Sequence, residues 1–410
     1  MRDGGRVAAA IGVLAGIEAR RTTAKLALKG WGDSARYAGA KDRAFVSGLV
    51  LDVLRRRRSL AWRMGGETDR ARVLAALRFA WDWPVERIEA AAAEDHGPGA
   101  LTAAERGRLA TAGSLADAPE PVAGDYPDWL ESNLVRAFGE SRAPEGAALA
   151  VRAPVDLRVN LLKTTSTRVE KALAGFHPSP IGPLPAALRI EAPRASERAA
   201  PVEATPEFEK GWFEVQDLGS QIAAGAAGDI AHKQVLDFCA GGGGKTLALA
   251  AMMGNTGQLY AYDSDARRLT DTVRRAQRAG VRNLQIRSPL DPDALSGLEG
   301  RMDLVFVDAP CTGSGVWRRH PDAKWRLSPE QLARRIAEQD AVLDAAAPFV
   351  KPGGRLIYVT CSLFAEENED RVAAFLDRTE GFARHGAARR LTPRTDGTDG
   401  FFIAKLSRSP

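Results

Sequence analysis

The chain has 410 residues, of which 45% are hydrophobic, 27% charged and 7% aromatic, with a formal net charge of +5 at pH 7. This length exceeds what one hydrophobic core usually serves, which predicts two or three domains, and the apolar fraction excludes a disordered chain. No run approaches the roughly 18 consecutive apolar positions of a membrane-spanning helix, and three cysteines are too few for a disulfide scaffold, so we expect a soluble, cytoplasmic protein.

Residues 1–125 open the chain with the periodicity of helices. Apolar side chains recur every three or four positions, which places them on one face of a helix. The first such positions are Val7, Ile11, Leu14 and Ile17. The glycines of residues 27–34 indicate a loop, and residues 95–127 have the Gly-, Ala- and Pro-rich composition of a linker. We therefore expect a small all-α bundle followed by a linker.

Positive charge is concentrated at this end of the chain. Residues 1–72 contain 16 Lys and Arg against 7 Asp and Glu. A basic end favours a polyanionic partner such as nucleic acid, although a solvated charged surface explains the same charges equally well. Both interpretations apply to the four arginines at 55–58. In residues 318–326 cations surround Trp325, which favours contact with RNA phosphates and bases over core packing of the indole.

Residues 126–230 predict a small α+β module. A helical stretch begins at residue 128, residues 155–160 alternate in the manner of a strand, and residues 191–206 have the composition of a loop. This mixture is typical of a unit with few elements of each kind.

Residues 231–410 alternate short apolar runs with helical stretches. The apolar runs are 235–238, 258–262, 304–307 and 356–359. Their alternation with helices predicts an α/β domain with a doubly wound, mostly parallel sheet. Because such a sheet binds ligands at the carboxyl ends of its strands, the residues that follow these runs form the candidate site.

The first candidate is the glycine-rich turn after the first run. It comprises Cys239, Ala240, Gly241, Gly242, Gly243, Gly244, Lys245 and Thr246. Position 239 is not the Gly that a P-loop needs, and no start within the turn completes G-x-G-x-x-G. An acid, Asp263, ends the second run and suits hydrogen bonds to a ribose. The turn and this acid favour a nucleoside cofactor without a pyrophosphate, of which S-adenosylmethionine is the common one.

Two of the three cysteines follow the remaining two runs. Cys311 lies just after Asp308 at the end of the third run, and Cys361 lies just after the fourth. A single buried cysteine is usually a small packing residue, but two at equivalent strand ends favour chemistry. A metal site is not expected, because the chain has five His and no closely spaced cysteine pair.

Taken together, residues 128–377 resemble the Sun/Fmu-type RNA cytosine-C5 methyltransferases. The matching segments are 216–221, 239–246, Asp263 with Arg268, 308–315, 351–354, 360–362 and 366–369. A weaker match at 28–32 and 54–58 resembles the NusB-like domain of the bacterial 16S ribosomal RNA methyltransferase B subgroup. The resemblance implies three domains: a NusB-like helical RNA-binding domain with linker at 1–125, an RRM-like module at 126–230 and a Rossmann-like methyltransferase domain at 231–410.

The resemblance also implies the roles of the site residues. Cys361 is the thiolate that attacks cytosine C6, and Cys311 assists its release. From the residues alone the two roles are interchangeable, since the Pro-Cys cysteine attacks in DNA cytosine methylases. Asp308 holds the N3/N4 edge of the base, and Lys245 is a cation able to depress the thiol pKa. The residues implied to bind S-adenosylmethionine are Cys239, Ala240, Gly241, Gly242, Gly243, Gly244, Lys245, Asp263, Arg268 and Asp308.

Two positions depart from the family pattern. Gly241 and Gly242 replace Ala-Pro, which makes the turn more flexible, and Ser288 stands where an acid for the adenine side is usual. We expect a monomeric RNA methyltransferase that acts on 16S ribosomal RNA, with no metal and no membrane partner. Transfer RNA is the alternative substrate. A non-catalytic RNA-binding assembly factor is the alternative of a different class, against which the presence of both Cys311 and Cys361 argues.

Overall fold

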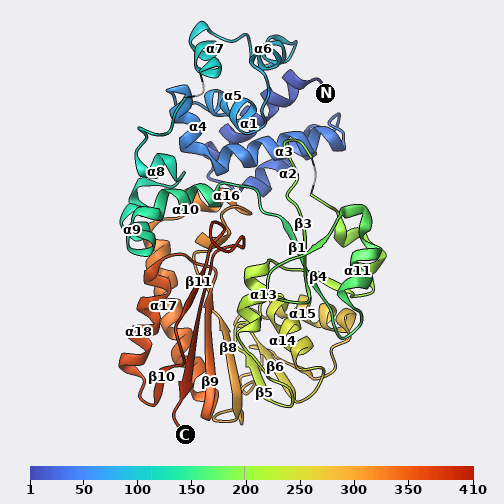
Figure 1. Cartoon of the computed structure of the whole chain (residues 1–410), viewed down its shortest axis with the longest axis vertical. Coiled ribbons are helices and arrows are strands. Elements are labelled where there is room, and N and C mark those ends of the chain that lie inside the picture. The colour runs from blue at the N-terminus through green and yellow to red at the C-terminus, as the bar shows by residue number, and fades with distance from the viewer. Residues whose placement is uncertain (112, 198) are drawn as a thin grey trace. The chain divides into compact units, whose positions relative to one another are not determined.

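The computed structural model describes residues 1–111, 113–197 and 199–410, and the chain divides into two compact units (Figure 1). The first, here called the helical unit, consists of Met1–Ala153, Ala192–Ala199 and Trp317–Leu327. The second, the sheet unit, consists of Pro154–Glu191, Ala200–Val316 and Ser328–Pro410. The three-domain boundaries expected from the sequence stay a prediction. Positions 112 and 198, within the predicted linker and loop, lie outside the described residues.

The helical unit is built from helices, of which those between residues 3 and 110 surround one apolar core. Its helices are α1 (Asp3–Arg20), α2 (Ala24–Ser34), α3 (Ala40–Arg55), α4 (Arg57–Met64), α5 (Asp69–Phe79), α6 (Val85–Ala93), α7 (Ala103–Ala110), α8 (Glu120–Ala123), α9 (Glu131–Phe138), α10 (Arg142–Leu149) and α16 (Pro321–Arg326). The predicted face of α1 is confirmed, since Val7, Leu14 and Ile17 are buried in the core together with Leu49 of α3 and Leu74 of α5. No helix in the described part of the chain is long and apolar enough to cross a membrane.

The loop predicted at residues 27–34 is wrong, because this segment belongs to helix α2. The hydroxyl oxygen of Thr23 caps the helix by accepting a hydrogen bond from the amide of Leu26 at 3.3 Å. Leu28 and Trp31 pack against the core of the helical unit. A glycine inside a helix destabilises it by only about 1 kcal/mol relative to alanine. The cap and the packing of Leu28 and Trp31 offset the cost of the two glycines that suggested a loop.

Two of the arginines at 55–58, Arg55 and Arg57, make ion pairs inside the helical unit. Arg55 is 8% exposed, and its guanidinium lies 2.8 Å from the carboxylate of Asp52 and donates to the carbonyl of Arg318. Arg57 pairs with Glu18. Arg55 and Arg57 therefore hold the helical unit together, which corrects both interpretations for these two residues.

The segment 317–327 also packs inside the helical unit, although the sequence pattern assigned it to the methyltransferase domain. The ammonium of Lys324 is buried and donates to the carbonyl of Arg55 at 3.1 Å. The indole N–H of Trp325 donates to the carbonyl of Leu54 at 2.6 Å. Burial lowers the pKa of Lys324 to about 8. Core packing of Trp325, the less favoured interpretation, is thus confirmed over base stacking.

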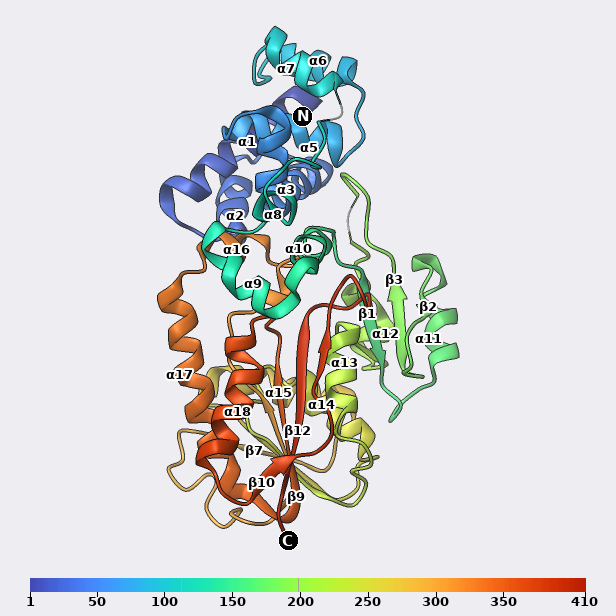
Figure 2. The ribbon, with the colours of Figure 1, turned by 60° about the vertical axis from the view of Figure 1, so that its left-hand side comes forward.

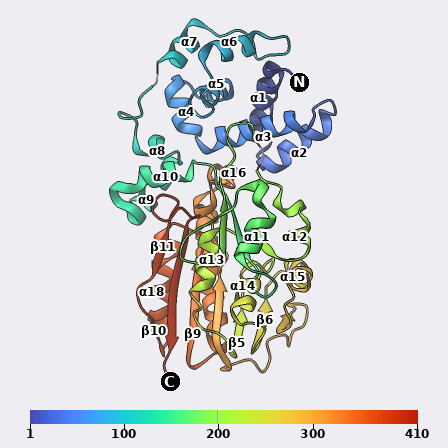
Figure 3. The ribbon, with the colours of Figure 1, turned by 45° about the vertical axis from the view of Figure 1, so that its right-hand side comes forward.

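A small antiparallel sheet opens the sheet unit, with the strand order β2-β3-β1-β4. Its strands β1, β2 and β3 are labelled in Figure 2, and its helices α11 and α12 in Figure 3. Its elements are β1 (Val155–Val159), α11 (Ser166–Ala172), β2 (Ser179–Pro180), β3 (Ala187–Ile190), α12 (Pro206–Glu209) and β4 (Phe213–Val215). The strand predicted at 155–160 is confirmed as β1, which lies in the middle of the sheet. Leu157, Leu188 and Phe213 from its three longer strands share a buried core with Val169 of α11, so this α+β module has a core of its own.

A larger sheet fills the rest of this unit, in the order β10-β12-β9-β8-β5-β6-β7, with β11 beside β12. The strands are β5 (Gln234–Asp237), β6 (Gln258–Tyr262), β7 (Leu284–Arg287), β8 (Met302–Asp308), β9 (Val350–Thr360), β10 (Phe382–Arg384), β11 (Arg389–Leu391) and β12 (Phe401–Arg408). The four predicted runs are confirmed as β5, β6, β8 and β9. The strands from β7 across to β9 pair in parallel, whereas β12 is antiparallel to β9.

Helices cover both faces of this sheet (Figure 2). They are α13 (Leu218–Gly225), α14 (Gly244–Met252), α15 (Ala266–Ala279), α17 (Pro329–Ala346) and α18 (Glu369–Arg378). Val305 of β8 packs toward Leu343 of α17 and Phe375 of α18, while its neighbour Phe306 packs on the opposite face with Leu249 of α14. Strands buried on both faces are mostly apolar, which is why each appeared in the sequence as a short, largely apolar run.

Candidate functional site

The glycine-rich turn joins β5 to α14 at the carboxyl end of the sheet. Gly241 and Gly243 have φ angles of 54° and 82°, a region that L-residues rarely adopt. A Cβ atom on Gly243 would lie 2.8 Å from the hydroxyl oxygen of Thr272. That hydroxyl group in turn donates to the carbonyl of Gly241 at 3.0 Å. The turn therefore needs glycine for its conformation and for its close contact with α15.

Asp263, which follows β6, is held against this turn. One carboxylate oxygen accepts a hydrogen bond from the amide of Gly241 at 2.8 Å, and Arg268 lies 3.4 Å from the same oxygen. The side chain of Asp263 is 4% exposed. Because an ionised carboxylate offers about four lone-pair positions, capacity remains for ribose hydroxyl groups. Ala240 is buried and Cys239 is partly buried beneath the turn, so these two residues contribute packing and backbone.

The two cysteines predicted from separate motifs meet in space. Cys311 follows β8 and Cys361 follows β9, two parallel neighbours in the sheet. Their Sγ atoms lie 3.4 Å apart, a thiol–thiol contact and not a disulfide. The hydrogen bond to Cys361, together with burial, raises the pKa of the Cys311 thiol well above its ordinary value. Cys311 is therefore protonated at neutral pH and is suited to donate a proton to its neighbour.

Glu367 fixes the two cysteine-bearing loops to each other. Its carboxylate accepts hydrogen bonds from the amide and hydroxyl group of Thr312, beside Cys311, and from the hydroxyl group of Ser362, beside Cys361. Gln339 of α17 donates to the same carboxylate at 2.9 Å. The side chain is fully buried, and burial raises the pKa of Glu367. One carboxylate thus sets the separation of both thiols.

Lys245 and Asp308 form an ion pair next to the thiols. The ammonium of Lys245, in the first turn of α14, lies 2.6 Å from Oδ2 of Asp308 at the end of β8. Burial by itself lowers the pKa of Lys245, but the charges of Asp308, Cys361 and Asp237 outweigh it and raise that pKa. Lys245 therefore stays cationic near Cys361, and Asp308, with its side chain 32% exposed, remains open to a ligand.

Asp237 is a buried acid beneath this site. Thr246 donates to its Oδ2 at 2.6 Å, whereas its Oδ1 has no hydrogen-bond partner among the described residues. Burial raises the pKa of Asp237 to about 7. An ionisable group at the end of a core strand is costly unless the site uses it, so this acid belongs to the electrostatics of the site.

All the site residues predicted from the sequence lie along one edge of the large sheet. Asp237, Thr272 and Glu367 were not predicted from the sequence as site residues. Of these, Asp237 was detectable as an acid inside an apolar run. Ser288 directly follows β7, the position at which the family acid is expected. The described residues contain no cluster of three or more His, Cys, Asp or Glu side chains arranged to hold a metal ion.

The residues at this edge fit S-adenosylmethionine. The glycine turn leaves room beside the backbone because a Cβ is absent at four consecutive positions. Asp263 supplies an acceptor at the end of β6, one strand from the turn. A doubly wound sheet with such a turn after its first strand and an acid after its second is the nucleoside-binding arrangement of Rossmann-like folds, the class to which S-adenosylmethionine-dependent methyltransferases belong.

Comparisons with known proteins agree with this class. Residues 229–407 match the model of the 16S rRNA methyltransferase RsmB/F family. A Synechocystis protein named "Probable ribosomal RNA small subunit methyltransferase B" is 32% identical over 303 residues, 69% of this chain and 67% of that protein. The chain belongs to this family of methyltransferases, which confirms S-adenosylmethionine as the predicted cofactor.

A second relative and a solved structure are also similar to this chain. The ribosomal RNA small subunit methyltransferase B of Escherichia coli is 34% identical over 290 residues, which cover 68% of this chain and 66% of that enzyme. The crystal structure of PH0851 superposes with a TM-score of 0.74 at 22% identity and covers 100% of this chain and 99% of that one. At that identity the likeness shows the fold alone.

Proposed function

We propose that the protein transfers a methyl group from S-adenosylmethionine to C5 of a cytosine in RNA, with 16S ribosomal RNA as the substrate. The observation that carries this proposal is the 3.4 Å contact between Cys311 and Cys361 beside the Lys245–Asp308 pair. Two thiols, a cation and an accessible carboxylate match what methylation at C5 of cytosine requires. Membership of the RsmB/F family supports ribosomal RNA as the substrate.

The reaction begins with a thiolate because C5 of cytosine is a poor nucleophile. The Cys361 thiolate adds to C6, which makes C5 enamine-like, while Asp308 accepts from the N4 amino group and orients the base. Lys245 stabilises the thiolate before it attacks. The bound cofactor supplies an electrophilic methyl group, which C5 accepts.

Release requires that the C5 proton leave and the bond between Cys361 and C6 break. Cys311 is protonated, because its pKa is raised, and its Sγ lies 3.4 Å from that of Cys361. It donates a proton to the departing sulfur, and the thiolate that remains on Cys311 accepts the C5 proton, so elimination restores the ring and both cysteines end as thiols. The two thiols thus have different tasks: one attacks and the other assists release.

We assign RNA binding to the rest of the chain. The basic helical unit acts as the NusB-like domain and the small antiparallel sheet as the RRM-like module, in a monomer that works in the cytoplasm. The net positive charge of residues 1–72 supports this assignment.

Paired cysteine variants test the mechanism. Cys361→Ala should abolish methyl transfer while cofactor binding, measured by calorimetry, persists. Cys311→Ala should accumulate a protein–RNA adduct that survives denaturing electrophoresis and carries one methyl group, since addition proceeds and release stalls. The double variant should form no adduct. Bisulfite mapping of 5-methylcytosine in a deletion strain identifies the RNA.

Other results would redirect the proposal. An adduct in Cys361→Ala and none in Cys311→Ala would exchange the two roles, and an adduct in the double variant would overturn the cysteine mechanism. Loss of 5-methylcytosine from transfer RNA alone would move the substrate to transfer RNA. No loss of 5-methylcytosine anywhere would favour a non-catalytic assembly factor.

A further inference from the structure

The glycine turn is held from the side of α15 by two side chains one helical turn apart. Thr272 donates to the carbonyl of Gly241 at 3.0 Å, and the guanidinium of Arg275 donates to the carbonyl of Gly242. In a planar trans peptide the C=O and N–H groups point in opposite directions. Anchoring the carbonyl of Gly242 on α15 therefore turns the amide of Gly243 to the other side, where it donates to the carbonyl of Ala240 at 2.9 Å.

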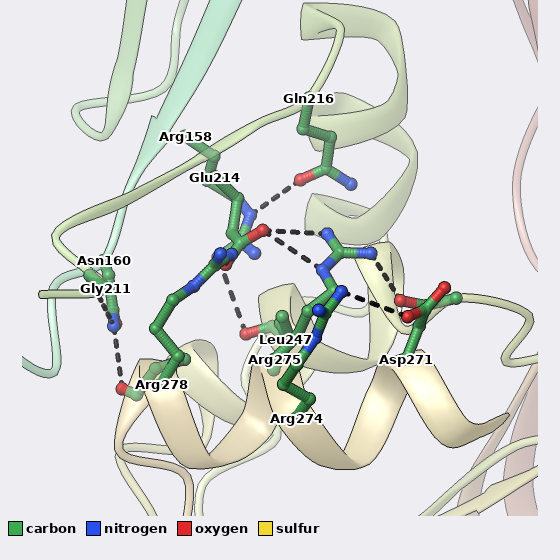
Figure 4. Close-up of polar contacts among 12 residues, drawn as sticks. Arg158, Asn160, Gly211, Glu214, Gln216, Leu247, Asp271, Arg274, Arg275 and Arg278 are labelled. Carbon is green, nitrogen blue, oxygen red and sulfur yellow. Dashed lines mark hydrogen bonds and ion pairs between the residues drawn. The ribbon is translucent and has the colours of Figure 1, made fainter. Parts of the chain in front are cut away.

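Arg275 is itself oriented by the small antiparallel sheet. Its Nε and Nη2 atoms lie 3.2 Å and 2.9 Å from Oε2 of Glu214 in β4 (Figure 4). The side chain of Glu214 is 5% exposed. Ordering a free arginine side chain costs about 2 kcal/mol of rotamer entropy. Here the two-point contact with a buried carboxylate already orders the side chain, so ligand binding does not have to. The remaining Nη1 is then fixed toward the turn.

Arg278, one turn further along α15, has a different role in the same cluster. It pairs with the other oxygen of Glu214, and its guanidinium lies 3.9 Å from the centre of the Phe208 ring. None of the contacts found among the described residues connects its side chain to the glycine turn. Arg275 and Arg278 therefore share a helix, a charge and a partner, and they differ in the contact with Gly242.

We propose that Arg275 is a positioning residue for the cofactor. Glu214 of the small sheet orients Arg275 toward the carbonyl of Gly242. The inference rests on the proposed role of the glycine turn as the cofactor-binding segment. It makes the small sheet a structural part of the cofactor site, in addition to its assigned role with RNA. Removal of Arg275 frees the peptide between Gly242 and Gly243, so the cofactor must order that peptide when it binds.

The test is calorimetric titration of the full chain with S-adenosylmethionine in the absence of RNA. Arg275→Ala should raise the dissociation constant about tenfold, the factor that corresponds to one hydrogen bond to a charged group. The matched control Arg278→Ala should stay within about twofold, because it leaves the contact with Gly242 intact. Arg275→Lys keeps the charge but not the two-point contact, so it should bind as weakly as the alanine variant.

A double-mutant cycle locates the effect. Glu214→Gln should weaken cofactor binding less than Arg275→Ala, and it should add almost nothing to that variant, since Glu214 acts through Arg275. Amide hydrogen exchange reports on the turn itself. The backbone amide of Gly243 should exchange faster in Arg275→Ala and in Arg275→Lys than in Arg278→Ala. If Arg275→Ala does not fold, Arg275→Lys carries the same comparison.

Several results would overturn the inference. Normal cofactor affinity in Arg275→Ala, or affinity fully restored in Arg275→Lys, would refute the positioning role of Arg275. The proposed cofactor site would be unaffected by that result. Equal weakening in Arg278→Ala would reduce the effect to loss of general stability. Failure of the unmodified protein to bind S-adenosylmethionine would instead refute the proposed cofactor turn, and this inference with it.

Discussion

The carboxylate of Glu367 accepts two hydrogen bonds from Thr312, one from its backbone amide at 2.8 Å and one from its hydroxyl group. Thr312 directly follows Cys311, and Glu367 holds the residue after Cys361 in the same way. The distance between the thiols is therefore set by a residue that touches neither of them.

Glu367→Gln tests this arrangement. An amide offers one acceptor oxygen in place of two. If that oxygen takes the place of Oε2 and keeps the hydroxyl groups of Thr312 and Ser362, the NH2 group faces two donors, the backbone amide of Thr312 and the side-chain amide of Gln339, and both of those bonds are lost. Methyl transfer should slow by about 10- to 100-fold, as expected when reacting groups move by about 1 Å. Cofactor affinity should be unchanged. Glu369→Gln is the control, because Glu369 pairs with Arg390 at 2.7 Å and lies in the same segment; equal slowing in both variants would contradict a specific role for Glu367.

Asp263→Ala should weaken S-adenosylmethionine binding by about 1–3 kcal/mol, because it removes an acceptor for the ribose and also the partner of the Gly241 amide. RNA affinity measured without cofactor should barely change. Asp265→Ala is the matched control, since Asp265 is close in sequence but pairs outward with Arg267. Parallel loss of RNA affinity in Asp263→Ala would mean that the residue supports the fold and not the ribose.

Asp237→Asn should change how stability depends on pH. The folded-state pKa is raised to about 7, whereas an unfolded Asp has a pKa of about 3.9, so the folded state binds the proton more tightly and stability falls as pH rises between these values. Between pH 5 and pH 8 the free energy of unfolding of the unmodified protein should fall by about 2–3 kcal/mol. The variant should not show this fall. Urea unfolding at both pH values measures this difference.

The control for that experiment is Asp377→Asn, which changes an exposed acid on α18. It should leave the difference between the two pH values as in the unmodified protein. If Asp237→Asn behaves like this control, Asp237 is ionised in the folded protein at pH 5 and the burial argument fails.

Arg55→Ala should destabilise the helical unit by about 3–5 kcal/mol, the cost of leaving one partner of a buried ion pair alone. Chemical denaturation followed by tryptophan fluorescence measures the loss. Lys29→Ala is the control, because its ion pair with Asp33 is exposed and contributes about 0–1 kcal/mol. Similar stability in both variants, with weaker RNA binding in Arg55→Ala, would restore the phosphate-contact interpretation of the run.

The sequence predicted those parts of the fold that local pattern decides. The middle of β8, from Leu304 to Val307, is apolar because both faces of the sheet are covered. Parallel strand ends share one edge, which is why Cys311 and Cys361 were expected in one site. The family resemblance then assigned roles that the pattern alone left open.

The sequence did not show contacts between residues that are far apart along the chain. The contacts of Arg275 with Glu214 and with Gly242 join positions separated by 61 and 33 residues, and no periodicity reports such pairs. The helix α2 was missed for another reason: its glycines suggested a break, but a cap and tertiary packing outweighed their low propensity.

The segment 317–327 has a consequence for biosynthesis. Helix α3 ends at Arg55, where the carbonyl group of Leu54 accepts a hydrogen bond from Trp325 and that of Arg55 accepts one from Lys324. At about 5–20 residues per second, a ribosome needs roughly tens of seconds to make the intervening chain. During that interval the first helices are complete in sequence but not in packing, so a nascent fragment that ends before residue 317 should be more sensitive to protease than the same helices in the finished protein.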